Sequence, residues 1–200
     1  MANDFDIENG ILKKNHCSEA NVIIPDNVKI IGDSAFKGCK SLISITIPSS
    51  VTEIGYSAFQ NCTSLTSVII PDGVTNIRME TFSGCTSLSS VTIPNSVTVI
   101  GVDAFKNCSS LSSVVIPDSV TKIGGYAFGW CSNLISVIIP DGVTEIGAYT
   151  FACCSSLKSV TIPESVTDIG NYAFNNCESL SSVIIPQNVK VIGEHTFPVA

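Results

Sequence analysis

Cysteine offers the most chemistry in this sequence, because thiols bind metals, attack substrates and form disulfides. Seven of the nine cysteines recur at one spacing of about 23 residues: Cys39, Cys62, Cys85, Cys108, Cys131, Cys154 and Cys177. If each repeat forms one coil of a stack, equivalent Cα atoms lie about 4.8 Å apart, within disulfide range but with parallel Cβ directions that suit a disulfide poorly. We therefore expect buried free thiols in this row, and exposed, oxidisable thiols at Cys17 and Cys153.

No catalytic residue, metal site or cofactor is predicted. The sequence has no C-x-x-C or Cys/His cluster, and His16-Cys17 stands alone, so zinc is not expected. It has no G-x-S-x-G, H-E-x-x-H, phosphate-binding or dinucleotide-binding motif. The two histidines, His16 and His195, lie at opposite ends of the chain, so no serine has an imidazole base beside it.

The unit that positions these residues is a repeat, of which Ser87 to Ser109 is one copy. Proline and phenylalanine recur at the same spacing as cysteine. The prolines are Pro25, Pro48, Pro71, Pro94, Pro117, Pro140, Pro163 and Pro186, and the phenylalanines are Phe36, Phe59, Phe82, Phe105, Phe128, Phe151, Phe174 and Phe197. A fixed period of this length is typical of solenoid proteins, in which each coil packs only on its neighbours.

Each repeat predicts one strand followed by a turn. Val68 and Ile70 alternate with Ser67 and Ile69, the period of two that indicates a strand with one buried face. Pro71 then ends the strand, since it has no N–H to donate. For the remainder of the coil we expect short 3₁₀ or irregular extended segments, because β-branched residues there disfavour a long helix.

Glycine or asparagine usually precedes the repeated cysteine, which suggests a left-handed backbone at that corner. This holds at Gly38, Asn61, Gly84, Asn107 and Asn176. Trp130 and Cys153 depart from the rule, so their coils either bend differently or tolerate larger side chains at this corner.

Residues 1–18 do not match the repeat. Asn9-Gly10 between short apolar segments is a strong hairpin signal, so we expect a capping hairpin at 1–18 and a single solenoid of about eight coils at 19–200. No capping element follows the last repeat, Val189 to Ala200. A bare end face favours end-to-end association, including a homodimer, or means that the array continues beyond this sequence.

The repeat resembles the BspA-like, or Treponema pallidum-type, leucine-rich repeats. The pattern is met by Cys108, Leu111, Val114, Ile116, Pro117, Val120, Ile123, Gly124, Ala127 and Phe128, whereas Arg78 stands where glycine is usual. The resemblance implies an arc with a parallel sheet on its concave face. It also implies a non-enzymatic adhesin or binding module of a cell surface or secreted protein, and it transfers no individual contact residue.

Composition limits the partners. The net charge of -7 argues against nucleic acid, which needs a basic surface. Apolar runs stop within a few residues, so no membrane insertion is expected. The N-terminus lacks the apolar core of a signal peptide. The sequence alone therefore leaves both an exported and a cytoplasmic protein open.

Two surfaces are candidate contact sites for a protein or glycan on another cell or matrix. The first is a concave strip: Ser67, Ile69, Ser90, Thr92, Ser113, Val115, Ser136, Ile138 and Thr161. Its exposed apolar residues suggest binding, although β-branched residues also simply suit a sheet. The second is an aromatic patch: Tyr126, Trp130, Tyr149 and Tyr172. Such residues anchor interfaces, but stacked rings also stabilise a surface, and we favour stabilisation slightly.

An acidic row, interrupted by Ser49, Asn95 and Gln187, follows the prolines: Asp26, Asp72, Asp118, Asp141 and Glu164. The row could attract cations or a basic partner. Aspartate after proline also caps turns, and we favour that interpretation. Calcium is only weakly indicated, because no EF-hand loop is present. The main hypothesis for the chain is a non-enzymatic binding module, and the alternative is an assembly unit that associates through its last coil.

Overall fold

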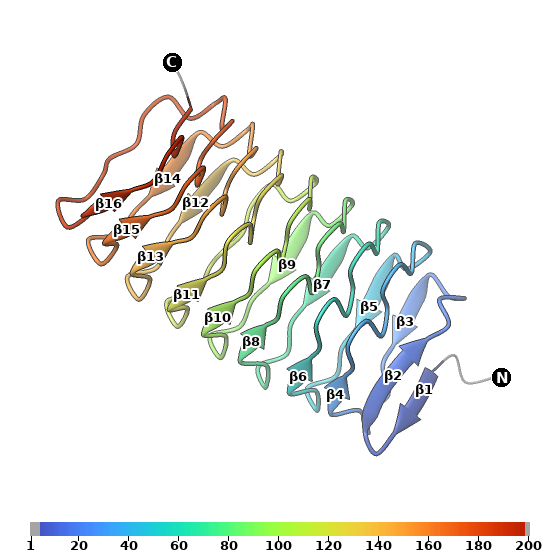
Figure 1. Cartoon of the computed structure of the whole chain (residues 1–200). Coiled ribbons are helices and arrows are strands. Elements are labelled where there is room, and N and C mark those ends of the chain that lie inside the picture. Colours follow the sequence, from blue (N-terminus) through green and yellow to red (C-terminus); the bar gives the residue numbers. More distant parts are fainter. Residues whose placement is uncertain (1–4, 199–200) are drawn as a thin grey trace.

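Each repeat forms one turn of a solenoid, called a coil below, in the computed structural model, which describes residues 5–198. The coils stack in chain order between a hairpin at one end and β16 (Val191–Ile192) at the other (Figure 1). Residues 1–4 of the predicted cap and 199–200 of the predicted solenoid lie outside the described residues. Two walls of parallel strands enclose the core, and the described chain contains no helix, hence none able to cross a membrane.

The predicted strands form the first wall. One sheet holds β3 (Asn21–Ile23), β5 (Ser44–Thr46), β7 (Ser67–Ile69) and β9 (Ser90–Thr92), and a second pair holds β12 (Ser136–Ile138) and β14 (Ser159–Thr161). The pairing is in register, with Val68 opposite Val91, so every coil turns its valine or isoleucine inward. We name the outer surface of these strands, with the equivalent residues 113–115 and 182–184, the strand face.

A second wall of two-residue strands was not predicted as a sheet. It consists of β4 (Ile30–Ile31), β6 (Glu53–Ile54), β8 (Asn76–Ile77), β10 (Val99–Ile100), β11 (Lys122–Ile123), β13 (Glu145–Ile146), β15 (Asp168–Ile169) and β16. Of the two conformations expected here, the extended one is present, and residues 5–198 contain no 3₁₀ helix. The physical reason is that backbone groups pair with the neighbouring coils, as Ile100 does with Ile77 and Ile123.

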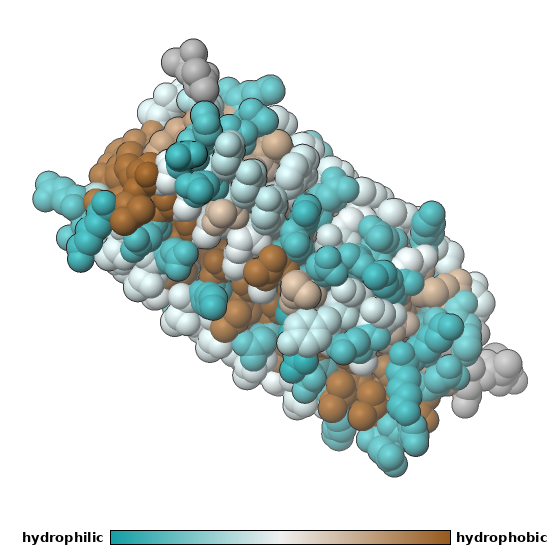
Figure 2. Space-filling model, viewed as in Figure 1, coloured by the Kyte–Doolittle hydropathy of each residue, from teal (hydrophilic) through white to brown (hydrophobic). Residues whose placement is uncertain are grey.

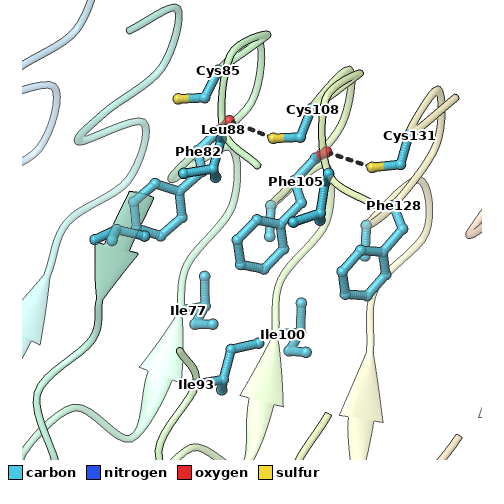
Figure 3. Close-up of a cluster of buried hydrophobic side chains, with 14 of the residues drawn as sticks. Ile77, Phe82, Cys85, Leu88, Ile93, Ile100, Phe105, Cys108, Phe128 and Cys131 are labelled. Atoms are coloured by element: carbon cyan, nitrogen blue, oxygen red, sulfur yellow. Dashed lines mark hydrogen bonds between the residues drawn. The ribbon is translucent and has the colours of Figure 1, made fainter. Parts of the chain in front are cut away.

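The core between the walls is a stack of identical side chains. The phenylalanine rings lie 5.0 to 5.7 Å apart from Phe36 to Phe197, and those of Phe82, Phe105 and Phe128 point the same way beside Ile77 and Ile100 (Figure 3). All from Phe36 to Phe174 are fully buried. Burying one such side chain contributes about 1.5–3 kcal/mol, so the period that aligns the rings also supplies much of the stability.

Each coil turns two left-handed corners, from Ser34 and Gly38 to Tyr172 and Asn176. Trp130 and Cys153 have φ of 60°, as Asn107 does, so the corner before the cysteine tolerates large side chains without a different bend. A second left-handed corner lies four residues earlier, at Ser57 (φ 54°) and Tyr149 (φ 59°), and sequence analysis missed it. Between the two corners, successive backbone N–H groups donate in turn to the next coil and to their own coil. Phe59 donates to Thr81 of the next coil at 2.8 Å, and the following residue bonds within its own coil.

The short-strand wall is interrupted between β6 and β8, which belong to different sheets. Arg78 directly follows β8, at the position where other coils carry glycine. Those glycines have no room for a side chain, since a Cβ on Gly124 would lie 2.5 Å from the Val102 nitrogen. The interruption therefore coincides with the one coil that has a side chain at this position.

The N-terminal cap is a hairpin of β1 (Phe5–Glu8) and β2 (Ile11–Asn15), turning at Asn9 (φ 52°) and Gly10 (φ 76°). Two consecutive left-handed residues are what a tight two-residue hairpin needs. β2 pairs in parallel with β4, so the hairpin extends the short-strand wall over the first coil. The predicted fold class, a parallel-strand solenoid with a hairpin cap, is confirmed.

Candidate functional site

The strand face is an exposed row of isoleucine, valine and threonine. All nine residues of the predicted strip are exposed. The exposed fractions are 70% for Ile69, 81% for Val115 and 69% for Ile138. Because strand residues alternate, placing Val68 and Val137 in the core forces their neighbours outward. The row continues through Ile23 and Ile184, so apolar side chains are exposed along the whole face.

Two grooves open in this face where the strand pairing is interrupted. Residues 113–115, between β9 and β12, form no strand, and a groove of about 370 Å³ opens there beside Val115, Ile138 and Asp118. A second groove of about 310 Å³ follows β14, beside Lys158, Thr161 and Ile184. The strand face is therefore half apolar and half hydroxyl-bearing, hollowed in two places and bordered by charge.

The acidic row borders the strand face, and its carboxylates have no partner within the described chain. The ion pairs of residues 5–198 involve other acids, and no hydrogen bond engages the side chains of Asp26, Asp72, Asp118, Asp141 or Glu164. The turn is closed by the backbone instead, through the N–H of Val74 and the carbonyl of Pro71 at 3.0 Å. Each acid therefore lies in the turn after its proline, as favoured, but its side chain does not cap that turn.

The aromatic patch is a face-to-face stack. Tyr149 lies 4.5 Å from the Tyr126 ring and 4.7 Å from the Tyr172 ring, and His195 continues the row at 5.1 Å. Trp130 stacks on Tyr126 at 6.0 Å. Burial and the neighbouring Tyr126 hydroxyl raise the pKa of Tyr149. The tyrosines share the second left-handed corner, which sets them one above another.

The cysteine row is a ladder of hydrogen bonds. Each thiol donates to the phenylalanine carbonyl of the preceding coil, as Cys108 does to Phe82 and Cys131 to Phe105, both at 3.2 Å (Figure 3). Burial raises the pKa of Cys131 to about 12, and that of Cys108 well above its ordinary value. These thiols are consequently protonated and shielded, which removes them as nucleophiles or metal ligands.

Cys39 is the exception, because it forms a disulfide with Cys17. The prediction of a free thiol at Cys39 and an exposed one at Cys17 is therefore wrong. Cys17 lies one residue out of phase with the ladder. The Cα–Cβ bonds of Cys17 and Cys39 are therefore not parallel, in contrast to those of successive ladder cysteines. Cys153 is half-buried and free.

A hollow of about 380 Å³ lies where Arg78 interrupts the period. Tyr56, Met79 and Val102 line it and are exposed on three successive coils. Arg78 lies 3.0 Å from Glu53 and its guanidinium stacks 5.0 Å from the Tyr56 ring. The patch lies where the repeat departs from its period, at Arg78 and Met79, which is one of the places where the sequence favours a distinctive site. Among residues 5–198, no three His, Cys, Asp or Glu side chains gather to hold a metal ion.

Comparison with known proteins gives consistent results. The model of the family described as BspA type leucine rich repeat region matches the sequence in six copies, over residues 7–135 and 99–199. The crystal structure of a Treponema pallidum leucine-rich repeat protein superposes with a TM-score of 0.85 at 34% identity, covering 91% of this chain and 90% of that one.

Two further structures resemble the chain. A Bacteroides ovatus leucine-rich repeat protein has a TM-score of 0.85 and 36% identity, over 92% of this chain and 50% of that one. A leucine rich cell surface protein of Faecalibacterium prausnitzii has a TM-score of 0.52 and 27% identity, over 94% and 75%. The chain thus spans half the length of the Bacteroides protein. No curated protein matches the sequence.

Proposed function

Because the chain belongs to the BspA-type leucine-rich repeat family, we propose that it is a non-enzymatic module that binds another protein through the strand face. The observation that carries the proposal is the row of exposed Ile69, Val115 and Ile138, each about 70% exposed or more. Soluble proteins rarely expose a long contiguous apolar surface unless it contacts a partner.

A protein partner fits this face better than a glycan. Sugars pack on exposed faces of aromatic rings, and residues 20–26 and their equivalents in later coils contain no aromatic residue. In the aromatic patch the faces of Tyr149 are covered by Tyr126 and Tyr172. Tyr149 therefore presents only its edge and hydroxyl to a ligand, which supports a stabilising role for the stack.

We propose that the protein is displayed at a cell surface or secreted. The Faecalibacterium relative is described as a cell surface protein. The Cys17–Cys39 disulfide supports the same location, since disulfides persist in oxidising compartments outside the cytosol. An adhesin of this kind would present its strand face to a protein of another cell or of the matrix.

Binding to a panel of purified matrix and cell-surface proteins tests the proposal. We expect at least one partner to bind the wild type and to lose at least tenfold in affinity for the variant Ile69→Lys/Val115→Lys/Ile138→Lys. The matched control, Thr98→Lys/Thr121→Lys/Thr144→Lys, adds the same charge beside the short-strand wall. A partner that both triple variants bind equally well would exclude the strand face as the site.

A second candidate function is assembly through the last coil. Val191 and Ile192 of β16 are exposed, and Ile185 lies beside a hollow of about 200 Å³ (Figure 2, brown patch next to β16). An exposed edge strand with apolar residues favours pairing with a second copy. Sedimentation should then show a concentration-dependent dimer that Ile192→Lys abolishes and Thr144→Lys does not. A monomer at all concentrations would exclude this function.

A further inference from the structure

We propose that the strand face receives a basic amphipathic α-helix of its partner, lying along the axis of the solenoid with its apolar side on the exposed row of isoleucine, valine and threonine. This inference rests on the proposed function, since it specifies the partner of the same face. Two independent features support it: the acidic border, whose carboxylates are unpaired, and the spacing of the coils.

The strand face and its border are strongly acidic. The seven-residue segments from the residue before each strand to the residue after proline, such as residues 66–72 and 112–118, contain five acids and one base. The acids are Asp26, Asp72, Asp118, Asp141 and Glu164, and the base is Lys158. The excess of four negative charges is more than half of the net charge of -7 of the chain. A partner segment with Lys or Arg beside its apolar residues therefore complements this face.

These carboxylates are available to a partner. They make no ion pair or side-chain hydrogen bond within residues 5–198, and the backbone closes the turns that carry them. Asp118 lines the same groove as the exposed Val115 and Ile138, so apolar and anionic contacts are within reach of one ligand. The turns close without these carboxylates, so the acids remain free to pair with a basic partner.

The spacing of the coils favours a helix over an extended segment. Parallel strands lie about 4.8 Å apart, and the phenylalanine rings of successive coils lie 5.0 to 5.7 Å apart. An α-helix advances about 5.4 Å per turn, so each turn meets one coil. In an extended segment, residues on the same side lie about 6.6 Å apart, so they no longer match the spacing of the coils after two coils.

The width of the face agrees with this orientation. The exposed residue of each strand and the acid after proline are three residues apart, about 10 Å along an extended chain. A helix is about 10 to 12 Å across with its side chains, so Lys or Arg on one flank reaches the acidic row. From β7 to β14 the face accommodates about four turns, which is a helix of about 14 residues.

Fluorescence anisotropy with synthetic peptides tests the inference. The probe is a labelled 16-residue Ala-based peptide with Leu at i, i+3, i+4 and i+7 positions and Lys on one flank. Three controls carry Glu in place of Lys, a scrambled order without amphipathicity, or an alternating Leu/Lys pattern that favours a strand. We expect the probe to bind at least tenfold more tightly than each control at 0.15 M salt, and to gain helical circular dichroism on binding.

Variants of the protein identify the contacts. Asp72→Asn/Asp118→Asn/Asp141→Asn should weaken binding of the probe at least tenfold at 0.15 M salt, with a much smaller effect at 0.5 M salt because exposed charges are screened. The matched control, Glu145→Gln/Glu178→Gln/Glu194→Gln, removes three exposed acids elsewhere and should retain wild-type affinity.

The outcomes separate the inference from the proposed function. Equal binding of the Glu peptide or of the strand-forming peptide, or no loss in the Asp triple variant, would overturn the inference. The strand face would remain the binding site if the partner panel still depended on Ile69, Val115 and Ile138. No binding of the probe at all also overturns the inference. The proposed function fails only if no panel partner depends on those three residues.

Discussion

The Sγ of Cys108 donates a hydrogen bond to the carbonyl oxygen of Phe82, 3.2 Å away and 26 residues earlier in the chain. The same oxygen accepts the backbone N–H of Cys85 at 3.1 Å. The bond therefore ties two coils together, and it recurs from Cys62 to Cys177. It gives a physical reason for cysteine at this position, where a small side chain must fill the core and donate to one carbonyl.

Replacing Cys108 by alanine should lower the free energy of unfolding by about 2 kcal/mol. About 1 kcal/mol comes from the hydrogen bond and the rest from the small cavity left by the sulfur. Chemical denaturation measures the change. Cys153→Ala is the matched control, since Cys153 is half-buried and outside the ladder, and it should change stability by less than about 0.5 kcal/mol. Equal losses in the two variants would contradict the role of the ladder.

The buried thiols should make the protein sensitive to alkali. Burial raises the pKa of Cys131 from 9.0 to about 12, so the thiol ionises first in the unfolded chain. Stability from this thiol is complete below pH 9 and is lost as the pH rises toward 12, by about 1.4 kcal/mol per pH unit. The free energy of unfolding of the wild type should therefore fall more steeply than that of Cys131→Ala between about pH 9.5 and 11.5. If the free energy of unfolding depended on pH in the same way in the wild type and in Cys131→Ala, the raised pKa of Cys131 would be refuted.

The aromatic stack should contribute to stability. Tyr149→Ser removes two ring contacts, at 4.5 and 4.7 Å, and should cost about 2 kcal/mol. Serine suits the backbone, because Ser34 and Ser57 occupy the same left-handed corner in earlier coils. Glu80→Ser, at this corner in a coil without stacking, is the control: it removes only the hydrogen bond that the Ser57 hydroxyl donates to Glu80 at 2.8 Å, and should cost about 1 kcal/mol. An unchanged midpoint for Tyr149→Ser would instead favour a binding role for the patch.

The sequence predicts those parts of the fold that repeat with a clear chemical signal. The common spacing of Pro71 and Phe82 with their equivalents defines the coil, and the alternation around Val68 defines the inward and outward faces of each strand. Both signals are redundant over every repeat. The exposed residues of the strand face follow the period as strictly as the core residues do. The period therefore does not distinguish binding residues from residues that only build the coil.

The features that sequence analysis missed lack such a signal. A two-residue strand such as β8 has one buried isoleucine and no alternation, so it cannot be told from a loop. The second left-handed corner is occupied by Ser57, Glu80 and Tyr149 rather than glycine or asparagine. The disulfide depends on how the cap meets the first coil, and that geometry is outside the repeat.

Cys153→Asn should stabilise the protein by about 0.5–1 kcal/mol. Cys153 has φ of 60°, and a left-handed backbone costs an ordinary residue about 1–2 kcal/mol, which asparagine reduces. Asn107 and Asn176 already occupy this corner with φ of 60° and 56°. The adjacent Cys154→Asn places a polar amide in the core and should instead destabilise by more than about 2 kcal/mol. If only Cys153→Asn raises the denaturation midpoint, the left-handed backbone at position 153, and not the loss of a thiol, causes the stabilisation.

Reduction of the Cys17–Cys39 disulfide should destabilise the cap. The bond closes a loop with a sequence separation of 22 residues, for which the lost chain entropy of the unfolded state corresponds to about 3 kcal/mol. In a solenoid each coil contacts only its neighbours, so the loss should be local. Amides of β2 should exchange hydrogen faster after reduction, whereas those of β13 should not change.

Cys17→Ser should reproduce this effect without reductant, and reductant should then have no further effect on it. Cys177→Ala is the control: it lowers stability, but its response to reductant should equal that of the wild type, because Cys177 is free. Faster exchange throughout the solenoid on reduction would show that the cap controls the stability of every coil. Unchanged exchange in β2 would show that the pairing of β2 with β4 holds the cap without the disulfide.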